Sequence, residues 1–429
     1  MRILLVGNYA LDNQASMLRY SDMLRRHLNL RGHMVEVVQP GVVVGGLVAQ
    51  PTLRKWLGYI DKYLFFPLRL RTRAAGFDLV HVCDHSNSMY LAHTASVPSS
   101  ITCHDLLAIG AALGRYPQQK VSWAGKVQQR WILKHLVAAR SVVCVSGTTA
   151  RELAAVSGGE RRKVVVIPNA TEFECSPAPE ASVLEIRERL GIAKGESYLF
   201  HVGGDLWYKN RFGVLRIFKL VLERLDSLGA AARGSGSRGR DETTTEILRV
   251  AQNDGSRGVG GEALPLRLVM AGAPLTREMR DFVAANLPAG SVIEVTGPTD
   301  EDLRRLYSGA AALLFPSLYE GFGWPLIEAQ CCGCPVITSN RAPMTEIAGP
   351  AALYIDPEDE AAAADTIVAN LDNLATLREG GFRNAKRFDP KAVFEAYEGF
   401  FAGLLRTRRI TDVVIAPNEA EAEPREVRD

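Results

Sequence analysis

The sequence lacks any long apolar segment. No uninterrupted apolar run in the 429 residues reaches the roughly 18 that a membrane-spanning helix needs. Only about five apolar residues precede the polar Asn8, too few for the core of an export signal. Seven cysteines is a low and odd count, which favours reduced thiols over a disulfide framework. Together these absences predict a cytoplasmic protein without a membrane anchor.

The sequence also lacks a Gly-x-Gly-x-x-Gly motif after its first apolar run, where only Gly7 is present. A dinucleotide-dependent dehydrogenase would need those glycines to bring the backbone close to a pyrophosphate. A hydrophobic content of 47% with 23% charged residues is instead that of an ordinary globular protein. At roughly 150 residues per domain, the length predicts two or three domains.

Acidic side chains are scarce in the first third of the chain. Residues 1–150 carry 17 Lys and Arg against 7 Asp and Glu, although the net charge of the whole chain is only +2. Basic and aromatic residues alternate in 54–73, and 106–151 contains no acid. Such segments are typical either of helices that contact an anionic membrane surface or of ordinary amphipathic helices. No nucleic-acid reading module accompanies them, so nucleic acid is not expected as a partner.

Short apolar runs alternate with helical periodicity along 1–170. Strands are predicted at 2–7, 35–38, 77–82, 99–103, 141–145 and 164–167, and a helix at 14–30. Strand–helix–strand order with short connections predicts a parallel, doubly wound α/β domain over 1–170.

A second series of the same kind follows a Pro- and Glu-rich linker at 171–195. Its strands are predicted at 198–202, 267–271, 292–295, 311–315, 335–338 and 352–355, in a second α/β domain over 196–385 with a helix at about 211–225. A Gly-, Ser- and Arg-rich insertion at 230–262 and an acidic tail at 412–429 are predicted to be disordered. Two such lobes usually hold a ligand in the cleft between them.

The densest chemical signal is a 23-residue segment that runs from Phe315 to Ile337. It predicts a strand end, a glycine loop with Gly321 and Gly323, and a helix that starts near Pro325. Glycines let the backbone approach a ligand, and the amide groups at a helix start suit a diphosphate. Glu320 and Glu328 could accept hydrogen bonds from sugar hydroxyls, although Glu328 could also be an ordinary acid near a helix start.

This segment resembles the signature of the retaining glycosyltransferases of family 4. The shared pattern is Pro-Ser-x-x-Glu-Gly-Phe-Gly-x-Pro-x-x-Glu-Ala-x-x-x-Gly-x-Pro-Val-Ile. Further elements resemble the family: His104-Asp-Leu, the segments 143–146 and 164–169, Val202-Gly-Gly with Lys209-Asn, 295–310 and 338–349. The resemblance implies a GT-B fold, in which two Rossmann-like domains face a cleft. It also implies that a helix within 386–411 packs back toward the N-terminal, acceptor-binding domain.

The resemblance implies a role for each matching residue. Glu328 would bind the ribose of a nucleotide-sugar, and Glu320 would contact the donor sugar. Lys209 would neutralise the departing diphosphate, which explains why no metal is expected. His104 would lie near the donor sugar. The implied catalytic residues are His104, Lys209 and Glu320, and the implied donor-binding residues are Gly203, Gly204, Lys209, Gly321, Phe322, Gly323, Trp324, Pro325, Leu326 and Glu328.

The chain departs from the family pattern in two loops. The loop after the first strand has no glycine beyond Gly7, and Gly204 and Tyr208 stand where many members have an arginine. The diphosphate would then be held by Lys209 with fewer positive partners. Asp205 in the same loop would either weaken anion binding or contact the sugar.

Metal sites are the weaker alternatives. Cys331, Cys332 and Cys334 lie close in sequence, but a zinc site usually needs a second ligand pair, so buried packing residues are expected instead. His81, His85 and His93 lie near Cys83 and Asp84 and leave a second metal hypothesis open. His85 or Asn87 could instead line the cleft.

The sequence therefore predicts a retaining, metal-independent hexosyltransferase. It would move a mannosyl- or glucosyl-type group from a nucleotide-sugar to a glycan or lipid-linked acceptor in cell-surface polysaccharide biosynthesis. The protein would act in the cytoplasm, with peripheral membrane contact through its basic domain. One alternative is a non-catalytic subunit that uses the same fold to bind a nucleotide or a partner. Another is an epimerase or phosphorylase on the same fold.

Overall fold

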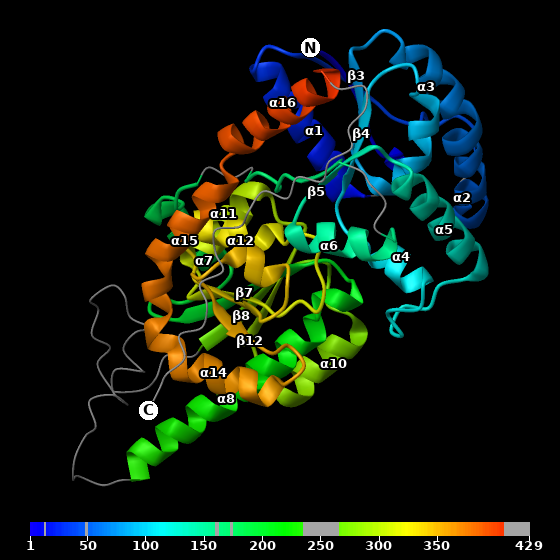
Figure 1. Ribbon diagram of the computed structural model, residues 1–429. Coiled ribbons are helices and arrows are strands. Elements are labelled where there is room, and N and C mark those ends of the chain that lie inside the picture. The colour runs from blue at the N-terminus through cyan, green and yellow to red at the C-terminus, as the bar shows by residue number, and fades with distance from the viewer. Residues whose placement is uncertain (13, 48–49, 159–162, 172–174, 235–265, 407–429) are drawn as a thin grey trace, which may run out of the picture. The chain divides into compact units, whose positions relative to one another are not determined.

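The computed structural model describes all 429 residues except 13, 48–49, 159–162, 172–174, 235–265 and 407–429. The described chain forms two compact units (Figure 1). Unit 1 comprises 1–168 and the segment from Val393 onward, and unit 2 comprises 169–392. The chain therefore leaves unit 1 once and returns to it after completing unit 2.

Unit 1 is built on a six-stranded parallel sheet with strand order β2-β1-β3-β4-β5-β6. Its strands are β1 Arg2–Val6, β2 Met34–Val38, β3 Leu79–Val82, β4 Ser99–Cys103, β5 Ser141–Cys144 and β6 Lys163–Val166. The central strands are mostly apolar because helices cover both faces of a parallel sheet, and His81, Ser100 and Thr102 are buried polar exceptions. Residues such as Leu4, Val80 and Val142 are accordingly fully buried.

The helices of unit 1 come from both ends of the chain. They are α1 Ala15–Leu30, α2 Pro51–Ile60, α3 Phe66–Ala74, α4 Leu107–Ala112, α5 Trp123–Val137, α6 Gly147–Val156 and α16 Pro390–Arg406. Short turns are η1 Ala10–Asp12, the π-helix η2 Asp61–Phe65 and η3 His85–His93. Figure 1 shows α16 beside α1, where Tyr20 hydrogen-bonds Tyr397 and Arg31 pairs with Glu398 at 2.6 Å.

Unit 2 repeats the architecture with strand order β12-β11-β10-β7-β8-β9. Its strands are β7 Ser197–Gly203, β8 Leu266–Gly272, β9 Val292–Thr296, β10 Ala312–Phe315, β11 Val336–Ser339 and β12 Leu353–Ile355. Every predicted strand is present, with bounds shifted by at most two residues. The predicted fold class, two doubly wound parallel sheets, is confirmed.

The helices of unit 2 cover both faces of this sheet, and Figure 1 shows α8 and α14 side by side. They are α7 Glu180–Arg189, α8 Arg211–Gly234, α10 Arg277–Asn286, α11 Asp300–Gly309, α12 Trp324–Cys331, α13 Met344–Ala348, α14 Glu360–Asn370 and α15 Leu377–Ala385, with η4 Trp207–Lys209, η5 Leu371–Thr376 and η6 Lys386–Phe388. Helix α8 continues to Gly234, past the expected start of the insertion at 230. The rest of that insertion and the predicted tail lie outside the described residues.

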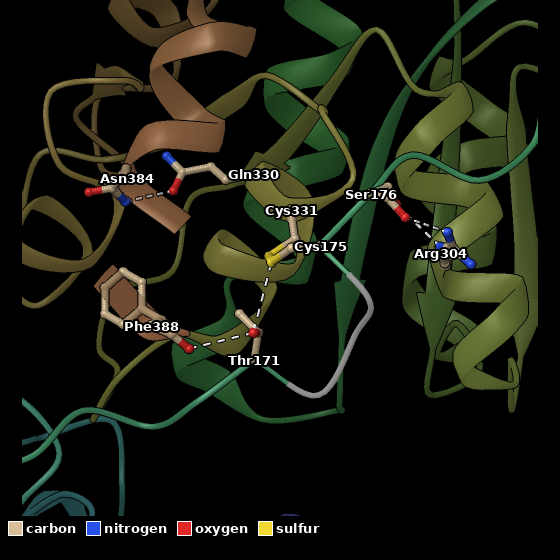
Figure 2. Close-up of a disulfide and its surroundings, with 8 residues drawn as sticks. All are labelled: Thr171, Cys175, Ser176, Arg304, Gln330, Cys331, Asn384 and Phe388. Carbon is tan, nitrogen blue, oxygen red and sulfur yellow. Dashed lines mark hydrogen bonds between the residues drawn. A yellow bond between two sulfur atoms is a disulfide. The ribbon is translucent and has the colours of Figure 1, made fainter. Parts of the chain in front are cut away.

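The expectation that the cysteines are all reduced is wrong. Cys175 and Cys331 form a disulfide, with their Cα atoms 4.3 Å apart (Figure 2). The bond joins the segment before α7 to the last residue of α12, across 156 positions of sequence. Cysteine count alone cannot reveal this pair, because the fold brings the two residues together. Cys332 and Cys334 are buried free thiols, as are Cys83, Cys103 and Cys144.

The segment that carries Cys175 is fixed to unit 2 by further contacts, some of which Figure 2 shows. The backbone N–H of Thr171 donates to the carbonyl of Phe388 at 3.1 Å, and the hydroxyl of Ser176 accepts from Arg304 at 2.7 Å.

Among the residues that the structure describes, no helix combines the length and the apolar character needed to cross a bilayer.

Candidate active site

The strand order of unit 2 reverses between β7 and β10. The chain adds β8 and β9 on one side of β7, and then returns to place β10 on the other side. At such a point the loops after the two strands diverge, which opens a crevice at the carboxyl edge of the sheet where ligands bind. Lys209, on η4 after β7, and Glu320, after β10, lie on the two sides of this point.

Lys209 and Glu320 form an ion pair across that point. The Nζ atom of Lys209 lies 2.7 Å from Oε1 and 3.0 Å from Oε2 of Glu320. Glu320 is only 8% exposed, and the ammonium group lies over the rings of Tyr208 and Phe315 at 5.6 and 5.4 Å. An ion pair with so little water around it is weakly screened, so the position of the lysine is well defined. Two residues that the sequence singled out separately are thus in direct contact.

The glycine loop ends at the start of α12. Gly323 is the N-cap residue and has a φ of +100°, a conformation that side chains other than glycine adopt with strain. Trp324 and Pro325 form the first turn, and the indole of Trp324 donates to the carbonyl of Ala170 at 3.1 Å. A helix start presents backbone N–H groups that suit an anion. Phe322 and Leu326 are buried, and they anchor the loop on either side.

Glu328 lies on α12 and is buried, with Tyr307 of α11 as a partner. The Tyr307 hydroxyl donates to Oε2 of Glu328 at 3.1 Å. Burial first, and then the neighbouring carboxylate, raises the pKa of Tyr307 well above its ordinary value, so the phenol keeps its proton. The hydrogen bond from Tyr307 therefore fixes the orientation of Glu328. Sequence reasoning did not give Tyr307 a role, although it lies in the segment 295–310 that resembles the family.

The loop after β7 approaches the end of β8 very closely. Gly272 has a φ of +113°, and a Cβ atom there would lie 2.5 Å from the carbonyl oxygen of Gly203. Below this loop, the Nδ1–H of His201 donates to the carbonyl of Leu314 at 3.0 Å. Burial lowers the pKa of His201 to about 4, so the ring is neutral and Nε2 carries its lone pair. Among the described residues, Nε2 has no hydrogen-bond partner.

The positive charges near the loop are few. Arg211 begins α8, but its guanidinium is buried and donates to the carbonyls of Ala273 and Pro274 at 2.6 and 3.1 Å. Asp205 lies 3.9 Å from that guanidinium and is exposed. Arg211 thus holds the β8 end of the loop, while Lys209 is the cation beside Glu320. Gly204, in the loop after β7, has open space where a side chain would be.

His104 belongs to unit 1, where it follows β4. Its Nε2–H donates to the carbonyl of Cys83 at 2.8 Å, and its ring meets the Tyr20 ring edge-on with centroids 4.5 Å apart. Burial lowers the pKa of His104, although Asp84 opposes this shift. The imidazole is therefore neutral, and the donor at Nε2 leaves the lone pair on Nδ1.

The groups considered for a metal have other partners. His81 is buried, and its two ring nitrogens lie 2.8 and 2.9 Å from the hydroxyls of Ser100 and Thr102. Cys331 is in the disulfide. In the part of the chain that the structure describes, no three or more His, Cys, Asp or Glu side chains are grouped so as to hold a metal ion.

Two family models match this chain. The model described as "Glycosyltransferase Family 4" matches residues 17–174, and the model described as "Glycosyl transferases group 1" matches residues 258–373. The first match lies mainly in unit 1, and the second includes the β10–α12 loop with Glu320 and Glu328.

Curated relatives agree with these matches. The chain is 26% identical over 309 residues to the O-antigen chain mannosyltransferase B of Escherichia coli. The match covers 71% of this chain and 70% of that protein. It is 42% identical over 73 residues to the O-antigen chain mannosyltransferase RfbU of Salmonella typhimurium. That shorter match covers 17% of this chain and 20% of RfbU.

A solved structure shares the fold. The structure of Anabaena Alr3699/HepE in complex with UDP and glucose matches with a TM-score of 0.64 at 14% identity, and covers 94% of this chain and 99% of that one. At this identity the likeness concerns the fold alone. The two family models and the shared architecture show that the chain belongs to the family 4 glycosyltransferases, also described as glycosyl transferases group 1, and is a hexosyltransferase with the GT-B fold.

Proposed function

We propose that this enzyme transfers a mannosyl- or glucosyl-type group, with retention, from a nucleotide-sugar to a glycan or lipid-linked acceptor in cell-surface polysaccharide biosynthesis. The observation that carries the proposal is the Lys209–Glu320 ion pair beside the start of α12, at the reversal point of the unit 2 sheet. A cation, a helix start and two buried carboxylates suit the parts of a nucleotide-sugar.

Each group in this arrangement binds one part of the donor. The amide groups at the start of α12 and the ammonium of Lys209 attract the diphosphate. Glu320 holds that ammonium within 3.0 Å and accepts hydrogen bonds from sugar hydroxyls. Glu328, oriented by Tyr307, accepts hydrogen bonds from the ribose. As the glycosidic bond breaks, negative charge grows on the diphosphate, and a fixed ammonium stabilises it without a metal ion.

The relatives support the choice of sugar and pathway. Two of them are named O-antigen chain mannosyltransferases, which points to mannosyl transfer in surface polysaccharide assembly. The HepE structure was obtained with UDP and glucose, so uridine is one of the bases to test.

We also propose that unit 1 contacts an anionic membrane surface through α2, η2, α3 and α5. Trp56 is 60% exposed, Leu68 66% and Trp123 81%. The only acid of residues 51–77, Asp61, is buried and accepts from the Tyr9 hydroxyl at 2.8 Å and from three backbone N–H groups of residues 43–45. Lys62 of η2 pairs with Asp12 and Arg73 of α3 pairs with Glu36, and the exposed aromatic and basic side chains that remain fit the interface of an anionic bilayer. This would place the enzyme at the cytoplasmic face of the membrane.

Nucleotide binding provides the first test of the donor proposal. Thermal unfolding would be followed with UDP, GDP and ADP, each with and without EDTA. A nucleotide at 100 times its dissociation constant stabilises the protein by about 2.7 kcal/mol. We expect one nucleotide to shift the melting temperature with EDTA present or absent. Product analysis by NMR would then show the α-anomeric linkage that retention of an α-linked donor requires.

Two results would contradict the proposal. The absence of a shift with every nucleotide would favour a non-catalytic subunit. An isomerised sugar, or a free sugar phosphate, would favour an epimerase or a phosphorylase.

For the membrane contact, vesicles of phosphatidylglycerol and of phosphatidylcholine would be sedimented with the protein. Equal binding to both would exclude an electrostatic contribution.

A further inference from the structure

The helical segment from Pro51 to Ala74 has its polarity reversed. It consists of α2, η2 and α3 in unbroken succession. Asp61 and Lys62 are only 1% and 9% exposed, whereas Trp56 and Leu64 are 60% and 56% exposed. A surface helix of a globular protein normally buries its apolar side chains and leaves its charged ones in water. Exposed apolar side chains that gather on one face indicate that this face binds an apolar partner.

The sheet of unit 1 has a reversal point of its own, between β1 and β3. The chain places β2 on one side of β1 and then β3 on the other. The loops after β1 and β3 therefore diverge at the carboxyl edge of the sheet, as the loops after β7 and β10 do in unit 2. This edge is where a parallel sheet binds its ligand, so we expect the acceptor sugar here in unit 1.

The buried charges attach η2 to that edge. Asp61 accepts from the Tyr9 hydroxyl, in the loop after β1, at 2.8 Å, and from three backbone N–H groups of the loop after β2. Lys62 lies 2.9 Å from Asp12, also in the loop after β1. The carbonyl of Lys62 accepts from the hydroxyl of Tyr90, on η3 after β3, at 3.2 Å. The inner side of η2 therefore contacts all three loops that surround the reversal point.

The outer side of α2 and η2 contains an apolar hollow of about 480 Å³. Its lining residues follow one another at helical spacing along a single stripe: Trp56, Leu57, Tyr59, Ile60, Tyr63 and Leu64. The ring of Tyr59 contacts those of Trp56 and Tyr63, with centroids 5.6 Å apart in both pairs. At 1.5 Å per residue this stripe extends over about 12 Å of helix. Its length and its continuous apolar surface suit an extended hydrocarbon chain.

The charges around the hollow favour an anion beside that chain. The Nζ atom of Lys62 lies over the rings of Tyr59 and Tyr63, both of which line the hollow, at 5.1 and 5.7 Å. Asp12 balances this ammonium, but Arg54 of α2 is exposed and the only acid of the helical segment is buried. The exposed charge beside the hollow is therefore positive. A phosphate that joins a sugar to a hydrocarbon chain complements it.

We propose that this hollow binds the hydrocarbon chain of a lipid-linked acceptor whose sugar is joined to the chain by a phosphate. The inference rests on the proposed function and selects the lipid-linked acceptor over a free glycan. The sugar would lie at the carboxyl edge of the unit 1 sheet, and the phosphate beside the basic rim of the hollow. A single acceptor molecule would fill this site, in contrast to the general contact of unit 1 with a bilayer surface.

The first test compares acceptors that differ only in chain length. Methyl and octyl α-D-mannopyranoside are used without vesicles and below micelle-forming concentrations, with the donor whose nucleotide stabilises the protein. Each methylene that leaves water contributes about fourfold in affinity. If about three of them enter the hollow, the KM of the octyl mannoside should be about 10- to 100-fold lower than that of the methyl mannoside.

Variants assign this preference to the hollow. Ile60 and Leu64 are exposed, so the double variant Ile60→Gln with Leu64→Gln should fold, and it should bring the two KM values within about threefold of each other. Leu53→Gln is the matched control, because Leu53 is exposed on the same helix but does not line the hollow. It should keep the wild-type preference. The donor KM and the thermal shift by nucleotide should stay unchanged in both variants.

A second test addresses the anion. Octyl phosphate should inhibit transfer to octyl mannoside competitively, and octyltrimethylammonium, with the same chain and the opposite charge, should inhibit at least about tenfold less. Equal inhibition by both would overturn the assignment of the phosphate.

A third test measures binding of the chain without transfer. Bromine quenches an indole only in close contact, so 8-bromooctyl α-D-mannopyranoside should quench the fluorescence of Trp56. Trp56→Phe should remove this quenching. Trp123→Phe, an exposed position on α5 that does not line the hollow, is the control and should retain it.

The outcomes separate the two proposals. Equal KM values for the two mannosides in the wild type overturn this inference and leave the donor chemistry intact, and so does a preference that survives in the double variant. If neither mannoside accepts a sugar, absence of quenching at Trp56 overturns it. A dimer that the double variant converts to a monomer, with both KM values unchanged, would show a second copy on this face instead. No nucleotide binding and no transfer by the wild type would overturn the proposed function, and the inference with it.

Discussion

The two reversal points of this molecule differ in how they use charge. In unit 2, Lys209 and Glu320 come from loops after β7 and β10 and form an ion pair next to a helix start. In unit 1, Asp84 and His85 are adjacent in sequence, and Asn8 joins them from the other loop. Both arrangements set a basic side chain against a carboxylate, but the partners come from two loops in unit 2 and from adjacent positions in unit 1.

The comparison also shows that the net charge of a domain says little about its site. Residues 1–150 are strongly basic, yet four polar residues at the reversal point of unit 1, Asn8, Asp84, His85 and Asn87, include no Lys or Arg. The basic residues are instead found at positions such as Arg54 on α2 and Lys126 on α5. A charge count thus indicates what the surface attracts, while the contacts of individual residues decide what the site binds.

The largest expected effect tests the anion role of unit 2. Lys209→Ala should lower kcat about 100- to 1000-fold, because a preorganised charge next to the leaving diphosphate is lost. Steady-state kinetics would measure this, and Lys219→Ala, an exposed lysine paired with Glu223, is the control. A kcat within about threefold of the wild type would show that Lys209 does not contact the diphosphate.

Acid should destabilise both units through one buried histidine each. Burial lowers the pKa of His81 to about 3 and that of His201 to about 4, against about 6.5 when unfolded. Below pH 6.5 these two histidines bind protons in the unfolded chain but stay neutral in the native protein. The free energy of unfolding therefore falls as pH falls. At pH 5 each histidine costs about 2 kcal/mol relative to pH 7.5.

Urea unfolding at several pH values would measure this loss. His201→Gln should flatten the pH dependence between 6.5 and about 4, and His81→Gln should flatten it further down, to about 3. The two units would then differ only below pH 4. A pH dependence unchanged in both variants would contradict the assignment to these rings.

The disulfide is expected to stabilise unit 2 alone. Reduction of Cys175–Cys331 removes a constraint on the unfolded chain, and should lower the free energy of unfolding by about 3 kcal/mol. Differential scanning calorimetry with and without dithiothreitol would measure this. The double variant Cys175→Ala with Cys331→Ala should no longer respond to the reductant, whereas Cys83→Ala in unit 1 should respond as the wild type does.

The smallest effect concerns the contact between the loop after β7 and the end of β8. Gly272→Ala places a Cβ atom 2.5 Å from the Gly203 carbonyl at a φ of +113°. We expect a loss of about 1–3 kcal/mol in stability, with a weaker nucleotide-induced thermal shift because the loop moves. Gly399→Ala, where α16 has open space, is the control and should be neutral or stabilising. Equal melting temperatures for both variants would show that the close approach is relaxed in solution.

Much of the fold follows from the sequence because buried parallel strands are short, continuous apolar runs. The strands of both units and the start of α1 were predictable on that basis. The length of α8 was not, because the Gly-, Ser- and Arg-rich composition of 230–262 placed Ala230–Gly234 in the predicted insertion, although Ala and Arg favour a helix. The relation between Cys175 and Cys331 was also hidden, because 156 residues separate them.

For the polar clusters at the two reversal points, the sequence likewise indicated single residues but not the contacts between them. A long local motif identified Glu320 and Glu328, and Lys209 followed from the family resemblance, whereas their direct contact and the role of Tyr307 required the structure. The hydrogen bond from Asn8 to Asp84 spans 76 positions and depends on the pairing of β1 with β3. No pattern within either loop encodes that pairing. Sequence reasoning therefore reached His85 as a metal-ligand candidate or a residue that could line a cleft, and Asn87 only as the latter.

The path of the chain has a consequence for biosynthesis. Unit 2 is inserted into unit 1, because the chain leaves unit 1 at Pro168 and returns at Val393. Tyr397, which hydrogen-bonds Tyr20 in the interior of unit 1, is translated long after the first sheet. On the ribosome, unit 2 can complete its sheet while unit 1 still lacks α16 and exposes residues that pack against it, such as Tyr20 and His81. Nascent chains that stop before Val393 should therefore be the ones that chaperones retain.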